Sequence, residues 1–141
     1  MSDPIPTSSA HVPAGWEPFD GKGFVDLVGP LYVRPTAGGL KAFGFVAAEK
    51  HANLIGLVHG GMLMTLADRA LGVGAWDSAG GPCVTIQLDM QFLSAVKMGE
   101  FAEISPELVR RTRSLCFMRG TMKVGERATA MATGVWKILD D

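Results

Sequence analysis

The longest helical pattern in the chain lies between residues 60 and 79. Apolar side chains recur there at steps of three and four residues, at Met62, Leu63, Leu66, Ala70 and Val73. This spacing places them along one side of a helix, as expected of a helix that packs against a core. Gly80 and Gly81 follow and predict where the helix ends.

The clearest strand comes next, because apolar and polar residues alternate from Val84 to Phe92. A period of two predicts one polar face and one buried face. The buried face would consist of Val84, Ile86, Leu88, Met90 and Phe92. Shorter β-branched and aromatic runs predict further strands at residues 29–34, 40–53, 100–110, 114–124 and 127–138. Two strands, one long helix and four strands predict an α+β fold in which a curved antiparallel sheet wraps around the helix.

The length of the chain, 141 residues, is enough for one well-packed core. Residues 1–15 are rich in Pro, Ser and Ala without periodicity, and predict a flexible N-terminal segment. Residues 16–141 are then expected to form a single domain. The eight Met and 18 Gly favour a closely packed subunit interface or an apolar pocket.

Charge and cysteine content limit the possible partners. The net charge of -1 and pI near 6.3 provide no concentrated basic face for nucleic acid. No apolar run reaches the length of roughly 18 residues that a membrane span needs. The N-terminus lacks the pattern of a secretory signal. Cys83 and Cys116 lie far apart and show no metal-binding spacing. We therefore expect a cytoplasmic protein that binds neither nucleic acid nor membranes.

The segment from Asn53 to Asp68 carries the strongest chemical signal. Gly60 and Gly61 stand where the predicted helix begins, so backbone N–H groups without helical partners lie there, unshielded by side chains, at the positive end of the helix dipole. Such donors can hold the oxyanion that forms when a thioester carbonyl is attacked, an effect of about 3 to 4 kcal/mol. A Gly-Gly pair is also common in tight turns, so this feature alone does not define a site.

Asp68 is the candidate catalytic carboxylate. By helical periodicity it shares the side of the helix that carries small and apolar residues, where it could activate water or attack a carbonyl. His59 could orient the substrate, while Asn53 and Thr85 could hold water or the thioester by hydrogen bonds. Each has an ordinary structural alternative: Asp68 on a solvated helix face, His59 bonded to backbone, Asn53 in a turn and Thr85 on the polar face of a strand.

Taken together, these residues resemble the PaaI-like branch of the hotdog-fold thioesterases. Asn53, Gly56, His59, Gly60, Gly61 and Asp68 stand at the spacing of that family's motif, and residues 87–100 and 109–117 resemble the strand and the hairpin that follow. The resemblance implies a curved sheet around a central helix and homodimers, or dimers of dimers, with shared active sites. It implies that Asp68 is the general base or nucleophile, Gly60 the oxyanion donor and Thr85 a residue that places water. Gly60, His59 and Asn53 would come from the partner subunit.

The resemblance is weaker at two turns. Residues 94–96 read Ser-Ala-Val where the family commonly has Pro, and the hairpin carries Arg110, Arg111 and Arg113 where a Gly-Arg or Gly-Lys pair is usual. These three arginines with Lys97 could bind the phosphates of coenzyme A, for which Gly61 is a further candidate contact. The alternative is a solvated, charged hairpin tip.

The leading interpretation is hydrolysis of an acyl- or arylacyl-CoA thioester to the free acid and CoA. No cofactor is predicted, since CoA belongs to the substrate, and the three histidines at positions 11, 51 and 59 have no metal-binding spacing. A non-catalytic module that binds acyl-CoA is the first alternative, although the chain has little room for the DNA-binding region of a sensor. An enoyl-CoA hydratase is a weaker one. The sequence does not predict the acyl group.

Overall fold

The computed structural model describes residues 12–140, so residues 1–11 of the predicted flexible segment lie outside the described residues. The described chain begins with β1 (Glu17–Phe19), α1 (Phe24–Val28), β2 (Leu31–Pro35), β3 (Lys41–Val46) and a short 3-10 helix, η2 (Glu49–His51). The long helix α2 (Gly60–Ala79) follows. The chain ends in β4 (Cys83–Phe92), β5 (Phe101–Ile104), β6 (Glu107–Arg111), β7 (Leu115–Val124) and β8 (Arg127–Ile138).

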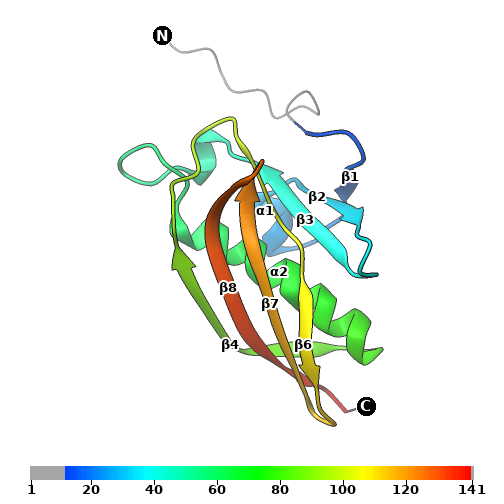
Figure 1. Cartoon of the computed structure of the whole chain (residues 1–141). Coiled ribbons are helices and arrows are strands. Elements are labelled where there is room, and N and C mark those ends of the chain that lie inside the picture. The colour runs from blue at the N-terminus through cyan, green and yellow to red at the C-terminus, as the bar shows by residue number, and fades with distance from the viewer. Residues whose placement is uncertain (1–11, 141) are drawn as a thin grey trace.

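All eight strands join one antiparallel sheet, which curves around α2 (Figure 1). The strand order is β1-β2-β3-β5-β7-β8-β4, and β6 pairs with β7. Buried side chains of α2 meet those of the inner strands in one core, which includes Leu66, Leu71, Phe43, Met118 and Trp136. The predicted α+β architecture, a curved sheet around one long helix, is confirmed.

Helix α2 has the predicted bounds because both of its ends are capped. Nδ1 of His59 accepts a hydrogen bond from the N–H of Gly61 at 2.8 Å. This bond satisfies one donor of the first turn. Gly80 ends the helix with a positive φ of 78°, and its N–H donates to the carbonyl of Trp76. Glycine has no steric penalty in that conformation. Among residues 12–140, neither α2 nor any other helix has the length and apolar character needed to cross a membrane.

Strand β4 differs from the prediction of one continuous apolar face. The pairing with β8 shifts between Thr85 and Gln87, which marks a β-bulge. One extra residue reverses the alternation of faces. Val84 and Ile86 are accordingly exposed, whereas Leu88 and Met90 pack against the core. The prediction that all five apolar residues share one buried face is therefore wrong. The bulge also turns Thr85 toward α2, away from the predicted polar face.

The predicted strand at residues 100–110 is in fact two strands. Ser105 and Pro106 interrupt it, and β5 and β6 pair in succession with β7. Proline cannot donate a backbone hydrogen bond to a neighbouring strand, which explains the break. Two short elements before β2, the strand β1 and the helix α1, were not predicted.

Candidate active site

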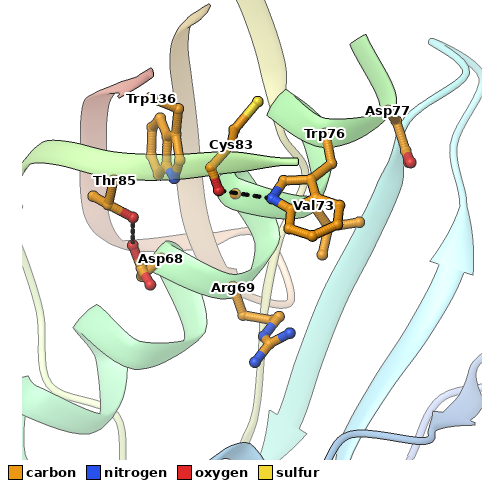
Figure 2. Close-up of a pocket in the computed structure, with 9 residues that line it drawn as sticks. Asp68, Arg69, Val73, Trp76, Asp77, Cys83, Thr85 and Trp136 are labelled. Atoms are coloured by element: carbon orange, nitrogen blue, oxygen red, sulfur yellow. Dashed lines mark hydrogen bonds between the residues drawn. The ribbon is translucent and has the colours of Figure 1, made fainter. Parts of the chain in front are cut away.

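Asp68 and Thr85 form the only hydrogen bond that joins a side chain of α2 to a side chain of β4 in the described part of the chain. The hydroxyl of Thr85 donates to Oδ1 of Asp68 at 2.7 Å (Figure 2). The bulge in β4 makes this contact possible, because it directs Thr85 to the helix side of the sheet. Oδ2 of Asp68 accepts no hydrogen bond from residues 12–140, so one carboxylate oxygen is available to a water or a substrate.

Two surface hollows share Asp68 in their lining. The C-terminal hollow, of about 280 Å³, lies between the second half of α2 and β4, and its lining includes Gly72, Val73, Trp76, Cys83, Thr85 and Trp136 (Figure 2). The N-terminal hollow, also of about 280 Å³, is lined by Phe24, Val25, Met64, Thr65 and Leu88. Asp68 and Arg69 border both. A thioester with its carbonyl at Asp68 could extend one way into each hollow.

The Asp68 carboxylate has no charged partner in this region of the described chain. Among the described residues it forms no ion pair, and the neighbouring Arg69 guanidinium lies 5.8 Å over the ring of Phe19 instead. Burial, together with the Cys116 thiol, raises the pKa of Cys83. A thiol with a raised pKa is a poor nucleophile because little thiolate is present. Cys83 therefore contributes to the wall of the C-terminal hollow and not to its reactive groups.

The loop before α2 is held together by Asn53. Its side-chain oxygen accepts hydrogen bonds from the N–H groups of Ile55 at 3.0 Å and Leu57 at 3.1 Å. Its backbone closes the same turn, since the Asn53 N–H donates to the carbonyl of Leu57 and the Gly56 N–H donates to the carbonyl of Asn53. This is the structural role of a turn asparagine. Only its side-chain NH₂ has no hydrogen bond within the described chain.

His59 fixes the glycine pair at the start of α2. Its Nδ1 accepts the hydrogen bond from the Gly61 N–H, so a substrate could bind that donor only by displacing the imidazole. The Gly60 N–H has no acceptor among residues 12–140. The ring of Phe92 would lie 3.3 Å from a Cβ at position 60, which leaves little room for a side chain there. Of the two predicted amide donors, Gly60 is therefore the available one.

Within one chain the predicted site residues fall into two groups. The loop half, residues 53–61, borders its own surface region, which is lined by Asn53, Leu54, Ile55 and His59. The helix half consists of Asp68 and Thr85 with the two hollows. Gly60 and Asp68 lie in different turns of α2. Their separation along the helix axis is about 12 Å. The structure therefore brings Asp68 to Thr85 and leaves Gly60 and His59 apart from them.

The predicted phosphate-binding cations also fall into two groups, with Lys97 beside the loop half and the three arginines far from it. Lys97 pairs with Leu57 of the loop half, and its N–H donates to Glu100, which also binds Arg127 at the start of β8. Arg111 lies at the opposite end of β7, paired with Cys116, and Arg110 and Arg113 flank it. A strand of the length of β7 spans about 30 Å, so these cations do not form one cluster within a chain.

The Glu100 carboxylate organises the Lys97 turn. Burial raises its pKa, but hydrogen bonds from the Lys97 N–H and the Arg127 guanidinium outweigh this effect and leave the pKa of Glu100 below its usual value. The carboxylate thus remains charged at neutral pH. It ties the turn that carries Lys97 to the beginning of β8.

Sequence reasoning missed Trp136, which forms the walls of the C-terminal hollow together with Trp76. Trp76 lies on α2 two turns beyond Asp68, and Trp136 is the cross-strand partner of Thr85. The helical spacing of Trp76 from Asp68 was visible in the sequence. The position of Trp136 was not, because it depends on the pairing of β8 with β4 and on the bulge.

Comparison with known proteins identifies the family. The sequence profile of the thioesterase superfamily matches residues 55–131, more than half of the chain. The chain belongs to the thioesterase superfamily. PA0474 of Pseudomonas aeruginosa, whose name assigns it provisionally to the esterases, is 32% identical over 131 residues, 91% of this chain and 98% of the relative. Human acyl-coenzyme A thioesterase 13 is 26% identical over 97 residues, 68% of this chain and 69% of the relative.

Solved structures agree with this assignment. The phenylacetic acid degradation protein PaaI of Thermus thermophilus, in a mutant form, matches with a TM-score of 0.74 at 25% identity, over 82% of this chain and 98% of its own. A Streptococcus pneumoniae protein described as a hypothetical thioesterase, solved with coenzyme A, matches with a TM-score of 0.72 at 26% identity, over 79% and 90%. The predicted resemblance to PaaI-like thioesterases, the hotdog fold and the class of enzyme, a thioester hydrolase, are confirmed.

Proposed function

We propose that the protein hydrolyses an acyl- or arylacyl-CoA thioester to the free acid and CoA, with Asp68 as the catalytic carboxylate. The observation that carries the proposal is the Thr85–Asp68 hydrogen bond at the border of the two hollows. It orients one carboxylate oxygen and leaves the other available at a point where both ends of a thioester have room. Human acyl-coenzyme A thioesterase 13 and the coenzyme A complex from Streptococcus pneumoniae support CoA as the thiol.

Asp68 acts either as general base or as nucleophile. As a base, it takes a proton from water while the water oxygen bonds to the thioester carbon, and the carbonyl electron pair moves onto oxygen. The N–H of Gly60 donates to that oxyanion. When the carbonyl forms again, the carbon–sulfur bond breaks and its electron pair leaves with the CoA thiolate, which regains a proton. As a nucleophile, Asp68 would instead attack the thioester carbon and expel the CoA thiolate, which leaves an acyl anhydride that water then hydrolyses to the free acid and the Asp68 carboxylate.

Gly60 is proposed to come from the partner subunit of a homodimer. Gly60 and Asp68 of one chain are too far apart to act on the same carbonyl, because about 12 Å of helix separates them. Strand β4 is an edge of the sheet, and an exposed apolar edge is a typical subunit contact. Its exposed side chains include Val84 and Ile86, with Met131 on the neighbouring strand β8. Pairing of two such edges would give a closed dimer with two shared sites, and two dimers could pair further.

The same arrangement would bring the predicted CoA-binding cations together. Lys97 is attached to the loop half, whereas Arg111 lies close enough to Cys83, in the wall of the C-terminal hollow, to influence the pKa of its thiol. A loop half that reaches the Asp68 of a partner would carry its Lys97 along. We propose that Lys97 of one subunit and the arginines of the other bind the same CoA molecule.

The decisive experiment measures release of the CoA thiol from a panel of acyl-CoA thioesters by wild type, Asp68→Asn and Asp77→Asn. Asp77 is a matched control, because it lines the same hollow from the same helix but pairs with Lys41 at 3.7 Å. We expect Asp68→Asn to lower kcat at least about 100-fold, since one general base or nucleophile is lost. We expect Asp77→Asn to change kcat less than about threefold.

Unchanged turnover in Asp68→Asn, or an equal loss in Asp77→Asn, would contradict the role of Asp68. Binding of acyl-CoA without thiol release would favour the non-catalytic alternative. Mass analysis of enzyme quenched during turnover separates the two roles of Asp68. An added acyl mass on the peptide that contains Asp68 indicates the nucleophile, and its absence indicates the base.

A further inference from the structure

Trp136 presents a hydrogen-bond donor to the C-terminal hollow. The residue is only 1% exposed, yet it lines this hollow. Its indole nitrogen makes no hydrogen bond within residues 12–140, although no fully buried side-chain nitrogen or oxygen in that span lacks a partner. The small exposed surface of Trp136 must therefore include Nε1. In Figure 2 this nitrogen lies at the end of the indole nearest Asp68 and Thr85.

Trp76, on the opposite wall, provides a contrast. Its Nε1 donates to the carbonyl of Cys83 at 2.9 Å, so its N–H group is already satisfied (Figure 2). The indole itself is 48% exposed and forms an apolar surface of the hollow. Two indoles thus border one space, and only that of Trp136 has an N–H available for a ligand.

Gly72 keeps the space in front of the Trp136 N–H open. A Cβ at position 72 would lie 3.2 Å from Nε1 of Trp136, closer than most packed side chains approach. Gly72 is also four residues beyond Asp68, so it lies on the same side of α2, one turn further along. A ligand with one end at Asp68 would meet the Trp136 N–H roughly 5 Å away, about four carbon–carbon bonds.

The dimensions of the hollow suit a compact acyl group. An apolar cavity of about 150 Å³ can hold benzene. The C-terminal hollow measures about 280 Å³, and Val73 and Trp76 supply apolar contact within it. The N–H of Trp136 is the polar point. A hydrocarbon that covered this N–H would deprive it of water without replacing the hydrogen bond, which is unfavourable.

We infer that the C-terminal hollow holds the acyl group of the substrate and that Trp136 selects acyl groups that carry an oxygen on the carbon about four bonds beyond the thioester carbon. This inference rests on the proposed function, because it takes the thioester carbonyl to lie at Asp68. Trp136 is thus a specificity residue, and Gly72 acts by keeping its donor accessible. The substrate class is a compact acyl-CoA with a keto or hydroxyl oxygen near the far end of its acyl chain.

Two probes of nearly equal shape test the selectivity: 5-oxohexanoyl-CoA and 5-methylhexanoyl-CoA, in which a methyl group replaces the ketone oxygen. We expect wild type to prefer the oxo probe by about tenfold in kcat/KM, since a site with a buried donor discriminates against an analogue that cannot accept from it. A wild type without this preference would overturn the inference.

Trp136→Phe removes the free N–H and should abolish the preference, mainly by lowering kcat/KM for the oxo probe. Trp76→Phe is the matched control: it deletes an N–H from the same hollow, but one already bonded to Cys83, and should keep the preference. Gly72→Ala fills the space at the nitrogen and should also abolish it. Because Trp136 belongs to the core, thermal melting of each variant is measured first, and Gly72→Ala decides the question if Trp136→Phe does not fold.

A preference that survives both Trp136→Phe and Gly72→Ala would overturn the inference. So would an equal loss with both probes, which would assign the N–H to a catalytic water or to structure. If wild type releases no thiol from any acyl-CoA, the proposed function fails separately. Calorimetric binding of the two probes to wild type and Trp136→Phe then still tests whether the hollow prefers an oxygenated acyl group.

Discussion

In the loop half, residues 53–61, polar side chains bond to the backbone of the loop itself. Asn53 accepts from two amides and His59 caps Gly61, so both side chains hold the loop in shape. In the helix half, side chains from different elements face one another, as Thr85 does across to Asp68. One carboxylate oxygen and the Trp136 N–H have no partner among the described residues.

The two halves are therefore proposed to contribute different kinds of group to an active site. In the proposed mechanism the loop half contributes one backbone donor, the Gly60 N–H, on a hydrogen-bonded turn, and its side chains act indirectly. In the proposed mechanism the helix half contributes the Asp68 and Thr85 side chains directly. Substitutions in the loop half are therefore expected to affect stability and activity together, whereas substitutions of Asp68 and Thr85 should affect activity alone.

Thr85→Val should have the largest effect among the changes that spare Asp68 itself. Loss of the hydroxyl removes the group that orients the carboxylate, and a hydrogen bond to a charged group is worth about 1.5 to 3 kcal/mol. We expect kcat to fall about tenfold. The melting temperature should stay almost unchanged, because Thr85 is exposed. Steady-state kinetics and thermal melting measure both.

Thr65→Val is the control for this substitution. The Thr65 hydroxyl donates to the carbonyl of Gly61 on its own helix, so its loss leaves the Thr85–Asp68 contact intact. We expect kcat to change less than about threefold, within the effect of a lost weak hydrogen bond. Equal losses in the two variants would show that general damage to this region, rather than the orientation of Asp68, lowers the rate.

His59→Ala tests the loop half. Removal of a helix N-cap costs about 1 kcal/mol, which is a few degrees in melting temperature for a chain of this size. We expect kcat to fall as well, because the turn that presents Gly60 loosens. His59→Asn supplies a capping side-chain oxygen in place of the His59 Nδ1 and should restore both quantities. Recovery of the melting temperature without recovery of kcat would instead assign the imidazole a direct contact with substrate.

Lys97→Gln and Arg111→Gln test whether cations from both halves of the site bind the same CoA molecule. Each should raise KM for acyl-CoA about threefold to fivefold at low salt, with kcat nearly unchanged and a smaller effect at high salt, as for a phosphate contact near solvent. Arg119→Gln is a suitable control, because Arg119 pairs with Glu107 on the outside of the sheet. If KM responds to only one of the two cations, CoA is bound by one half of the site alone.

His51, just before the loop half, gives the smallest effect. Its Nδ1 accepts from the Ala48 N–H and its other ring nitrogen lies 2.6 Å from the Val28 carbonyl, an arrangement of the neutral ring. Burial lowers the pKa of His51. The unfolded chain therefore binds the proton more readily, and stability is lost as pH falls below about 6.5. Melting curves should show this loss in wild type, and a smaller pH dependence in His51→Gln. An equal pH dependence in the two proteins would contradict it.

The sequence was informative where one local pattern determines the outcome. Helix α2 has its predicted bounds because His59 and Gly80 cap an amphipathic run. Asp68 and Thr85 were both named as candidates, but their contact depends on a bulge that unbroken alternation from Val84 to Phe92 conceals. The large distance between Lys97 and the arginines within one chain results from strand pairing, so it could not be predicted from local spacing. Pro106, by contrast, was a visible signal for the break between β5 and β6.

The central claim, that the loop half and the helix half of one chain serve different active sites, is tested most directly by mixing two variants with lowered activity. Asn53→Ala damages the loop half and Asp68→Asn the helix half. If each site combines the loop half of one subunit with the helix half of its partner, a mixed dimer has one site with both defects and one intact site. Random exchange should then recover about a quarter of wild-type thioesterase activity. Activity no higher than the average of the two parent proteins, after subunit exchange is verified, would contradict the account.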